Sequence, residues 1–178
     1  MSLIYLGLGS NLNDRYANLR RALAELQEQV DITAVSPVFS TRPWGMADQP
    51  KFLNICIEAT TSLSPLKTLH FIKRIEQKMG RLPSEKWGPR LIDIDILFYD
   101  SLVIADEELI IPHPHIAERA FVLAPLATII PDFRHPQIGE TVQEMLDRIG
   151  SEEVDQLFEM PFPQNSPEQK QETGETSF

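Results

Sequence analysis

Apolar residues recur along the chain in patterns that predict strands and helices in alternation. Residues 1–9 are typical of a buried first strand. The leucines that follow fall at helical spacing, and Asn13 is the expected cap of their helix. Residues 31–41 and 52–59 are rich in β-formers and alternate again, which predicts a pair of strands.

The next segments continue the alternation. Pro65 begins a second predicted helix, whose apolar stripe ends before Gly80. Residues 91–99 are the strongest predicted strand, and a turn then leads into residues 102–105. The order is therefore βαββαβ, which favours an α+β fold, a ferredoxin-like sandwich with two helices on one face of a largely antiparallel sheet.

The C-terminal part of the chain adds to this core. Residues 116–130 and 141–149 predict extra C-terminal helices, separated by a proline-rich stretch. The last residues are mostly Gln, Glu, Ser, Thr and Pro, which leaves little to bury. We therefore expect a single domain over residues 1–160 and a disordered tail over residues 161–178.

Charge narrows the classes of partner. The 178 residues include 16 Lys and Arg against 26 Asp and Glu, a formal charge of −10, which argues against sequence-independent binding of nucleic acid. Basic residues nevertheless outnumber acidic ones between residues 70 and 90, which favours a small, highly charged anion as partner. For Lys73, Arg74 and Lys78, the alternative is a solvated helix face.

The cysteine content and the hydropathy pattern indicate the cellular compartment of the protein. The single cysteine, Cys56, excludes an intrachain disulfide, and no Cys/His cluster has the spacing of a structural zinc site. Polar residues follow the apolar opening at once, so we expect no secretory leader, and acidic residues interrupt every long apolar run. These features predict a cytoplasmic protein with no membrane partner.

Two carboxylates in the strongest strand are the clearest candidates for chemistry. Asp93 and Asp95 lie two residues apart, so their side chains share one face of the strand. Adjacent carboxylates repel each other, and their hard oxygens favour Mg²⁺ that bridges to phosphate oxygens. Arg90 can lean over the same face and grip phosphate oxygens in pairs. The alternative is the solvent-facing side of an edge strand.

Three further groups could contact a substrate. His113, His115 and Arg119 form a second basic cluster, in which phosphate contacts are favoured over a transition-metal site. The amide of Asn54 stands in an apolar strand and needs a hydrogen-bond partner. Aromatic residues near predicted loops could hold a flat heterocycle, with core packing as the alternative for each of them: Trp44, Phe52, Trp87 and Phe121.

The glycine-rich segment at the end of the first predicted strand is a weak candidate for a nucleotide-binding loop. Gly7-Leu8-Gly9 resembles the start of a dinucleotide loop, but the third glycine and the ribose-binding acid are missing. The chain also has no Walker A motif. A nucleotide must therefore bind in another way.

Several short motifs, taken together, resemble one family. They run in order over about residues 1–150: Gly9-Ser10-Asn11-Leu12 with Asp14-Arg15, Asp48-Gln49-Pro50 with Leu53-Asn54, Arg74-Ile75-Glu76, Trp87-Gly88-Pro89-Arg90 with Asp93 and Asp95, and Pro112-His113-Pro114 with Arg119 and Phe121. The family is 6-hydroxymethyl-7,8-dihydropterin pyrophosphokinase, a transferase of folate biosynthesis. The resemblance implies transfer of diphosphate from ATP to the hydroxymethyl group of the pterin, which leaves AMP.

The resemblance also implies a role for individual residues. Two Mg²⁺ ions with ATP would be held by Asp93 and Asp95. Catalytic roles are implied for Arg81, Arg90, Asp93 and Asp95. ATP contacts are implied for Lys73, Glu76, Lys86, Trp87, Arg90, Ile96, His113 and Arg119. Pterin contacts are implied for Thr41, Pro43, Trp44, Phe52, Asn54, Trp87, Asp93 and Phe121.

Two alternatives belong to other classes of protein. A ferredoxin-like binding module would sense a small ligand and would not need the paired aspartates. A metal-dependent phosphohydrolase would use the same magnesium site with water as acceptor, but it would not need a slot for a heterocycle. We expect a monofunctional enzyme that acts as a monomer, with residues 42–48 and 81–88 as mobile loops that exclude water.

Overall fold

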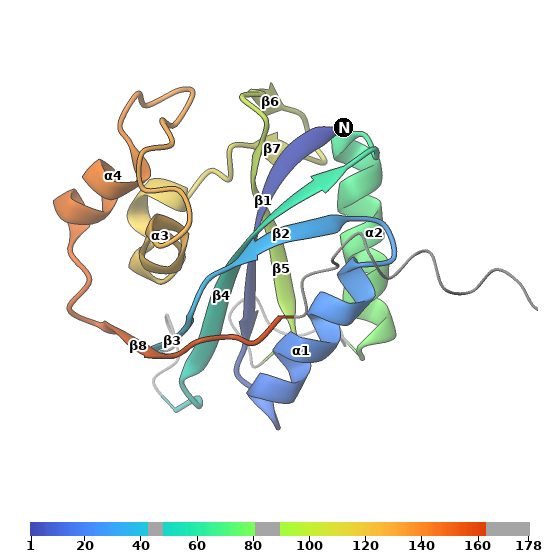
Figure 1. The fold of residues 1–178 in the computed structure, drawn as a ribbon, viewed down its shortest axis with the longest axis vertical. Helices are drawn as coiled ribbons and strands as arrows, with labels where there is room; N and C mark the ends of the chain where they lie inside the picture. The colour runs from blue at the N-terminus through green and yellow to red at the C-terminus, as the bar shows by residue number, and fades with distance from the viewer. Residues whose placement is uncertain (43–47, 81–89, 163–178) are drawn as a thin grey trace, which may run out of the picture.

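The main sheet is antiparallel and is built around the first strand of the chain (Figure 1). The computed structural model describes residues 1–42, 48–80 and 90–162. Within these residues the six-stranded sheet has the order β5-β1-β4-β3-β8, and β2 also pairs with β4. The strands are β1 (Ser2–Ser10), β2 (Asp31–Val35), β3 (Val38–Thr41), β4 (Phe52–Thr61), β5 (Asp93–Tyr99) and β8 (Val154–Phe158). A separate two-stranded sheet consists of β6 (Ile104–Ala105) and β7 (Ile110–Ile111).

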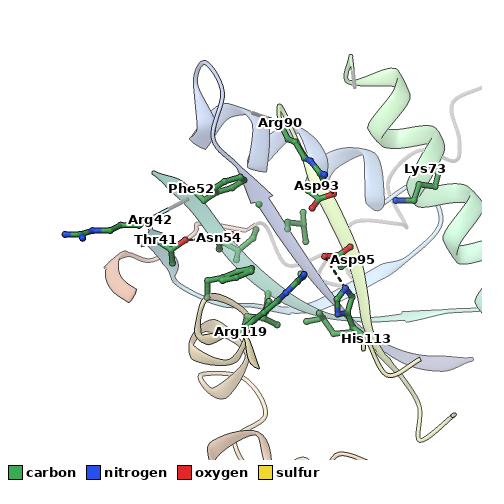
Figure 2. A pocket seen from close by; sticks show the side chains of 18 residues that line it. Thr41, Arg42, Phe52, Asn54, Lys73, Arg90, Asp93, Asp95, His113 and Arg119 are labelled. Carbon is green, nitrogen blue, oxygen red and sulfur yellow. Dashed lines mark hydrogen bonds and ion pairs between the residues drawn. The ribbon is translucent and has the colours of Figure 1, made fainter. Parts of the chain in front are cut away.

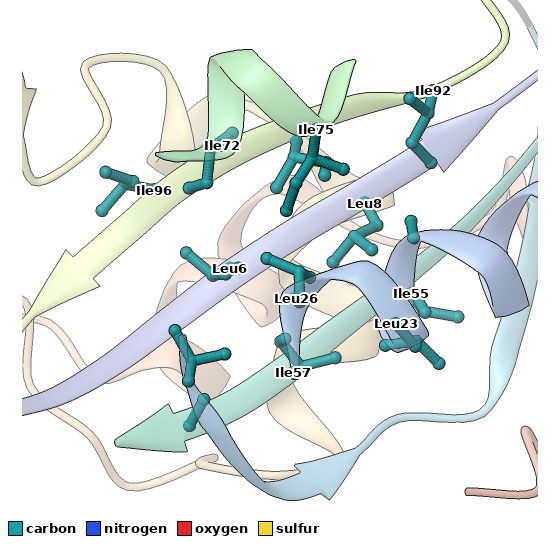
Figure 3. Packing of buried hydrophobic residues seen from close by; sticks show 14 of the residues in the cluster. Leu6, Leu8, Leu23, Leu26, Ile55, Ile57, Ile72, Ile75, Ile92 and Ile96 are labelled. Atoms are coloured by element: carbon teal, nitrogen blue, oxygen red, sulfur yellow. The ribbon is translucent and has the colours of Figure 1, made fainter. Parts of the chain in front are cut away.

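Two helices cover one face of this sheet, as the βαββαβ pattern predicts. Helices α1 (Arg15–Leu26) and α2 (Pro65–Lys78) pack against the alternate apolar residues of β1, β4 and β5 (Figure 3). Leu6, Ile57 and Ile96 belong to this cluster. Burial of these side chains is the main stabilising contribution to the fold.

The helix caps show where local chemistry sets the element boundaries. The carboxylate of Asp14, not the predicted Asn13, caps α1, because its Oδ1 accepts a hydrogen bond of 2.9 Å from the Ala17 amide. Asn13 takes a positive φ of 55° in the turn before the helix. Helix α2 begins at Pro65, as predicted, and Gly80 follows its end with a φ of 95°, a conformation that favours glycine.

The C-terminal helices cover the opposite face of the sheet (Figure 1). They are the 3-10 helix η1 (Ile116–Glu118), α3 (Ala120–Ala127) and α4 (Val142–Ile149), and they build a second apolar cluster with Tyr5 and Phe98. The helical prediction for residues 116–130 is confirmed in part, because the segment forms η1 and α3 but Arg119 between them is extended, with φ −116° and ψ 96°. The sheet therefore lies between two helical layers.

The strand β8 was not predicted from the sequence. Its residues are mostly exposed, so they lack a clear alternation of apolar and polar positions. Backbone pairing with β3 determines the strand, and Val154 lies opposite Thr41. No helix in the described ranges is both long and apolar enough to span a bilayer.

Candidate active site

A pocket opens on the face of the sheet that carries α3, where α3 does not fully cover the strands (Figure 2). It has a volume of about 330 Å³, within the range of small-molecule sites. Its floor consists of the central strand β1 and its two neighbours, β4 and β5. The pocket therefore joins residues that lie far apart in the sequence.

The strand register explains which residues meet on this floor. Gly9 lies opposite Asn54 of β4 on one side and opposite Asp93 of β5 on the other. Gly7 occupies the equivalent place between Cys56 and Asp95. These glycines thus lie inside β1 and not in a loop, and because they lack side chains the floor stays open between the amide and the carboxylates.

Asp93 and Asp95 form the acidic end of the pocket, as predicted from their spacing. Burial, followed by the charge of the neighbouring Asp93, raises the pKa of Asp95 to about 6. Arg90 balances the negative charge of Asp93 through an ion pair, with 3.0 Å between its guanidinium nitrogen and the Asp93 carboxylate. Figure 2 shows Arg90 and Asp93 pointing toward one another.

His113 lies on the other side of the carboxylates, and its charge differs from the expectation. Its amide donates a hydrogen bond of 3.0 Å to the Leu97 carbonyl, which holds its ring nitrogen 3.8 Å from the Asp95 carboxylate. Burial, with Arg119 and His115 adding to it, lowers the pKa of His113 to about 4. The ring is therefore neutral at pH 7 and does not add to the positive charge of the pocket.

Arg119 and Lys73 supply positive charge at this end. The extended backbone at Arg119 lets its side chain enter the pocket, and its guanidinium lies over the Phe121 ring at 5.6 Å. Lys73 reaches the pocket from α2 and contacts Glu76 at 3.1 Å. Figure 2 shows both cations on the side of the pocket that holds Asp95.

Two residues predicted to contact ATP do not line this pocket. The side chain of Ile96 alternates with Asp95, so it packs into the cluster beneath α2. Glu76 is 1% exposed and accepts a hydrogen bond of 2.9 Å from the Ile94 amide. Glu76 thus anchors the segment between the two aspartates from behind the sheet. His115 also lies outside the pocket, 3.5 Å from the Glu118 carboxylate.

Asn54 and two aromatic rings form the other end of the pocket. The Asn54 amide nitrogen donates a hydrogen bond of 2.9 Å to the Thr41 hydroxyl, which gives this buried amide the partner that the sequence required. Phe52 and Phe121 line the same space from β4 and α3. The combination suits a flat molecule with donors and acceptors along one edge.

Some predicted site residues lie outside the described part of the chain. These are Pro43, Trp44, Arg81, Lys86 and Trp87, together with most of both predicted mobile loops. Conversely, sequence reasoning missed Ile55, Cys56, Leu97 and Val122 as lining residues, and it considered Gly7 only as part of a loop. Period-two alternation from Asn54 and from Asp95 could have identified Cys56 and Leu97, whereas Val122 depends on helix packing.

The donor set of the pocket fits a hard divalent cation. Asp93 and Asp95 offer carboxylate oxygens on one face, with the mutual repulsion that a bound cation would relieve. In the three described ranges, no group of three or more His, Cys, Asp or Glu side chains is arranged to hold a metal ion. Two carboxylates leave coordination positions of such a cation open to substrate oxygens and water.

Comparison with known proteins identifies a single family. Residues 5–131 match the model of the 7,8-dihydro-6-hydroxymethylpterin-pyrophosphokinase (HPPK) family. The chain is 42% identical over 144 residues to a 2-amino-4-hydroxy-6-hydroxymethyldihydropteridine pyrophosphokinase of Aquifex aeolicus, across 81% of this chain and 90% of that one. It is 40% identical over 144 residues to a folic acid synthesis protein of Dictyostelium discoideum, across 81% of this chain and 22% of that one.

Solved structures show the same fold at lower identity. An HPPK-DHPS of Plasmodium falciparum, solved with pterin and p-hydroxybenzoate, superposes with a TM-score of 0.67 at 18% identity. The match covers 83% of this chain and 41% of that chain. The chain thus spans less than half the length of this solved structure, and the likeness is one of fold.

Proposed function

The chain belongs to the 7,8-dihydro-6-hydroxymethylpterin-pyrophosphokinase family and is a pyrophosphokinase of folate biosynthesis, and from this we propose how its pocket works. The pocket transfers the terminal diphosphate of ATP to the hydroxymethyl group of 6-hydroxymethyl-7,8-dihydropterin and leaves AMP. One observation supports this assignment most directly: a single pocket floor, left open by Gly7 and Gly9, has a buried amide at one end and paired carboxylates at the other.

The pterin occupies the end of the pocket that holds Asn54. A pterin is flat and has donors and acceptors along one edge, so the Asn54 amide can pair with that edge while Thr41 fixes the amide. Phe52 and Phe121 contact the ring faces. The hydroxymethyl group then extends across the glycines toward Asp93 and Asp95.

The triphosphate of ATP occupies the end of the pocket that holds the aspartates. Asp93 and Asp95 would hold two Mg²⁺ ions, which supply charge neutralisation on the phosphates when bound. Arg90 and Arg119 bind phosphate oxygens. Nδ1 of the neutral His113 ring accepts a hydrogen bond from the His115 backbone, so its Nε2 donates a hydrogen bond without adding charge.

The reaction exchanges one phosphorus–oxygen bond for another. The hydroxymethyl oxygen bonds to the β-phosphorus, and the bond from that phosphorus to the oxygen bridging the α-phosphate breaks, so AMP leaves with that oxygen and the bonding electron pair. The proton of the hydroxyl group is released to solvent. The residues of the pocket contribute by holding the two substrates in line and by neutralising charge at the β-phosphoryl group. Trp44, Trp87, Arg81, Lys86 and Pro43 keep the roles that the family resemblance implies.

Three broader assignments accompany this mechanism. We infer a ferredoxin-like topology for the core, supported by the strand order β5-β1-β4 with β2 and β3 beyond β4. We also propose a monomer in the cytoplasm, and the buried free thiol of Cys56 is compatible with a reducing compartment.

An assay of AMP release tests the proposed function. Purified protein is incubated with ATP, Mg²⁺ and 6-hydroxymethyl-7,8-dihydropterin, with a control that omits the pterin. We expect AMP formation that depends on both the pterin and Mg²⁺. Release of inorganic phosphate without pterin would instead indicate a hydrolase, and pterin binding without AMP would indicate a binding module.

The Gly9→Ala variant is expected to weaken pterin binding about tenfold, because the new Cβ would lie 2.8 Å from Oδ1 of Asn54 and displace the amide. Gly7→Ala adds the same methyl group to the same floor but meets Leu97 at an ordinary distance of 3.5 Å, so we expect it to weaken pterin binding less than Gly9→Ala does. Fluorescence titration with the pterin measures both affinities. Equal affinities in the two variants would contradict the role assigned to Gly9.

A further inference from the structure

A buried amide outside the pocket connects the two ends of the site. Asn11 directly follows β1, is 0% exposed and is not among the residues that line the pocket. Its side-chain oxygen accepts a hydrogen bond of 2.7 Å from the backbone N–H of Arg90, and its backbone N–H donates one of 3.1 Å to the Arg90 carbonyl. Asn11 therefore holds the main chain of Arg90 at both its donor and its acceptor.

The nitrogen of the same side chain reaches the other end of the site. It donates a hydrogen bond of 2.9 Å to the Gln49 side chain, and it lies 3.5 Å from the Pro50 carbonyl. Pro50 is two residues before Phe52, where β4 begins. One side chain thus connects the segment that leads into the pterin strand with the segment that leads into the metal-binding strand.

The hydrogen bonds of Asn11 act on a residue of the pocket itself. Arg90 reaches Asp93 at 3.0 Å, and this reach depends on where the Arg90 main chain stands relative to β1. Residue 90 precedes β5, and its main chain is held by two hydrogen bonds to Asn11. The backbone of Asn11 binds the Arg90 carbonyl, and only the side-chain oxygen of Asn11 binds the Arg90 N–H, so loss of the side chain would leave that N–H unheld. A small shift of the Arg90 main chain would therefore move a group that contacts the reacting phosphates.

We propose that Asn11 is a positioning residue for diphosphate transfer, which fixes Arg90 over Asp93 in register with the pterin-binding end of β4. The inference rests on the proposed function. An amide suits this position, since it supplies both the acceptor that the Arg90 N–H needs and the donors that the Gln49 side chain and the Pro50 carbonyl need.

A double-mutant cycle with Arg90 tests this proposal. Asn11→Ala is expected to lower kcat by roughly 10- to 100-fold. In an Arg90→Ala background the same substitution should have little further effect, because the group that it positions is gone. If the kcat loss from Asn11→Ala persists in full in that background, Asn11 does not act through Arg90 and the proposal is overturned.

Asn18→Ala is the matched control for a merely structural role. The Asn18 amide donates hydrogen bonds to the Ser10 hydroxyl at 3.1 Å and to the Leu12 carbonyl at 2.8 Å, so it braces the same junction without touching Arg90. We expect Asn18→Ala to lower the melting temperature but to keep kcat. A kcat loss in Asn18→Ala equal to that of Asn11→Ala would overturn the proposal.

A second variant covers the case in which Asn11→Ala does not fold. Asn11→Asp keeps the acceptor for the Arg90 amide and loses the donors, so we expect a smaller fall in kcat that again disappears in the Arg90→Ala background. If Asn11→Asp and Arg90→Ala lower kcat independently of each other, the proposal is overturned here too. A wild-type protein that forms no pterin-dependent AMP would instead contradict the proposed function, so the two failures are distinguishable.

Discussion

Replacing Asp95 by asparagine is expected to lower the rate of AMP formation by about three orders of magnitude, or about 4 kcal/mol of transition-state stabilisation. The substitution keeps the size of the side chain and removes its charge. Asp95 contributes one of the two carboxylates at the phosphate end of the pocket. In the variant, only the Asp93 carboxylate of this pair is left to bind Mg²⁺. Steady-state kinetics with saturating Mg²⁺, ATP and pterin measure the effect.

The stability of the same variant separates loss of chemistry from loss of fold. The folded pKa of Asp95 is raised to about 6, above its ordinary value of 3.8, so its contribution to stability is present below about pH 4 and is lost as the pH rises through 6. In metal-free buffer at pH 7.5, Asp95→Asn should therefore be at least as stable as the wild type. Urea unfolding with EDTA measures this difference.

An exposed aspartate provides the control for Asp95→Asn. Asp106→Asn changes an exposed side chain outside the pocket that accepts a local hydrogen bond from the Glu107 amide, so turnover should stay unchanged. Normal turnover of Asp95→Asn would remove the basis for placing the metal at this pair. A collapse in its melting temperature would show that the side chain supports the fold instead.

Replacing Asn54 by alanine is expected to raise the pterin Kd by roughly 10- to 100-fold, which corresponds to about 1 to 3 kcal/mol of lost hydrogen bonding. The amide is buried and already held by Thr41, so it meets the pterin edge with little reorganisation. The KM for ATP should change little, because Asn54 lies opposite Gly9, across β1 from Asp93. Fluorescence titration and steady-state kinetics measure the two constants.

Thr41→Val is the companion variant for Asn54. It removes the hydroxyl that accepts from the Asn54 amide and leaves the amide in place, so we expect a smaller loss of pterin affinity than in Asn54→Ala. A similar rise in the ATP and pterin constants of Asn54→Ala would show a general disturbance of the pocket. An unchanged pterin Kd would contradict the placement of the pterin at this amide.

Strands and helices with buried faces were predictable from the sequence. The alternation around Asp93 and Asp95 predicted both a strand and a shared face for the two carboxylates, and the register confirms that face. The amide of Asn54 was predictable as a candidate because a polar group in an apolar strand needs a partner. Each of these inferences uses only residues that are neighbours in the chain.

Features that depend on distant partners were not predictable in this way. β8 exists because β3 offers a free edge, and its own residues are too exposed to show a pattern. Arg119 interrupts a stretch whose composition is helical, and the interruption turns its side chain into the pocket. The neutral state of His113 follows from burial beside Arg119, which sequence spacing does not reveal.

The sequence by itself thus determined the order of elements, the pair of carboxylates and the pterin-pyrophosphokinase motifs, because each is a property of short segments. Tertiary structure decided that Gly7 and Gly9 separate the two ends of the pocket, and that Asn11 lies between Arg90 and Gln49. These facts arise from strand register and from hydrogen bonds between residues 38 to 79 positions apart. Pairing across such distances depends on the whole packed sheet, which no local pattern encodes.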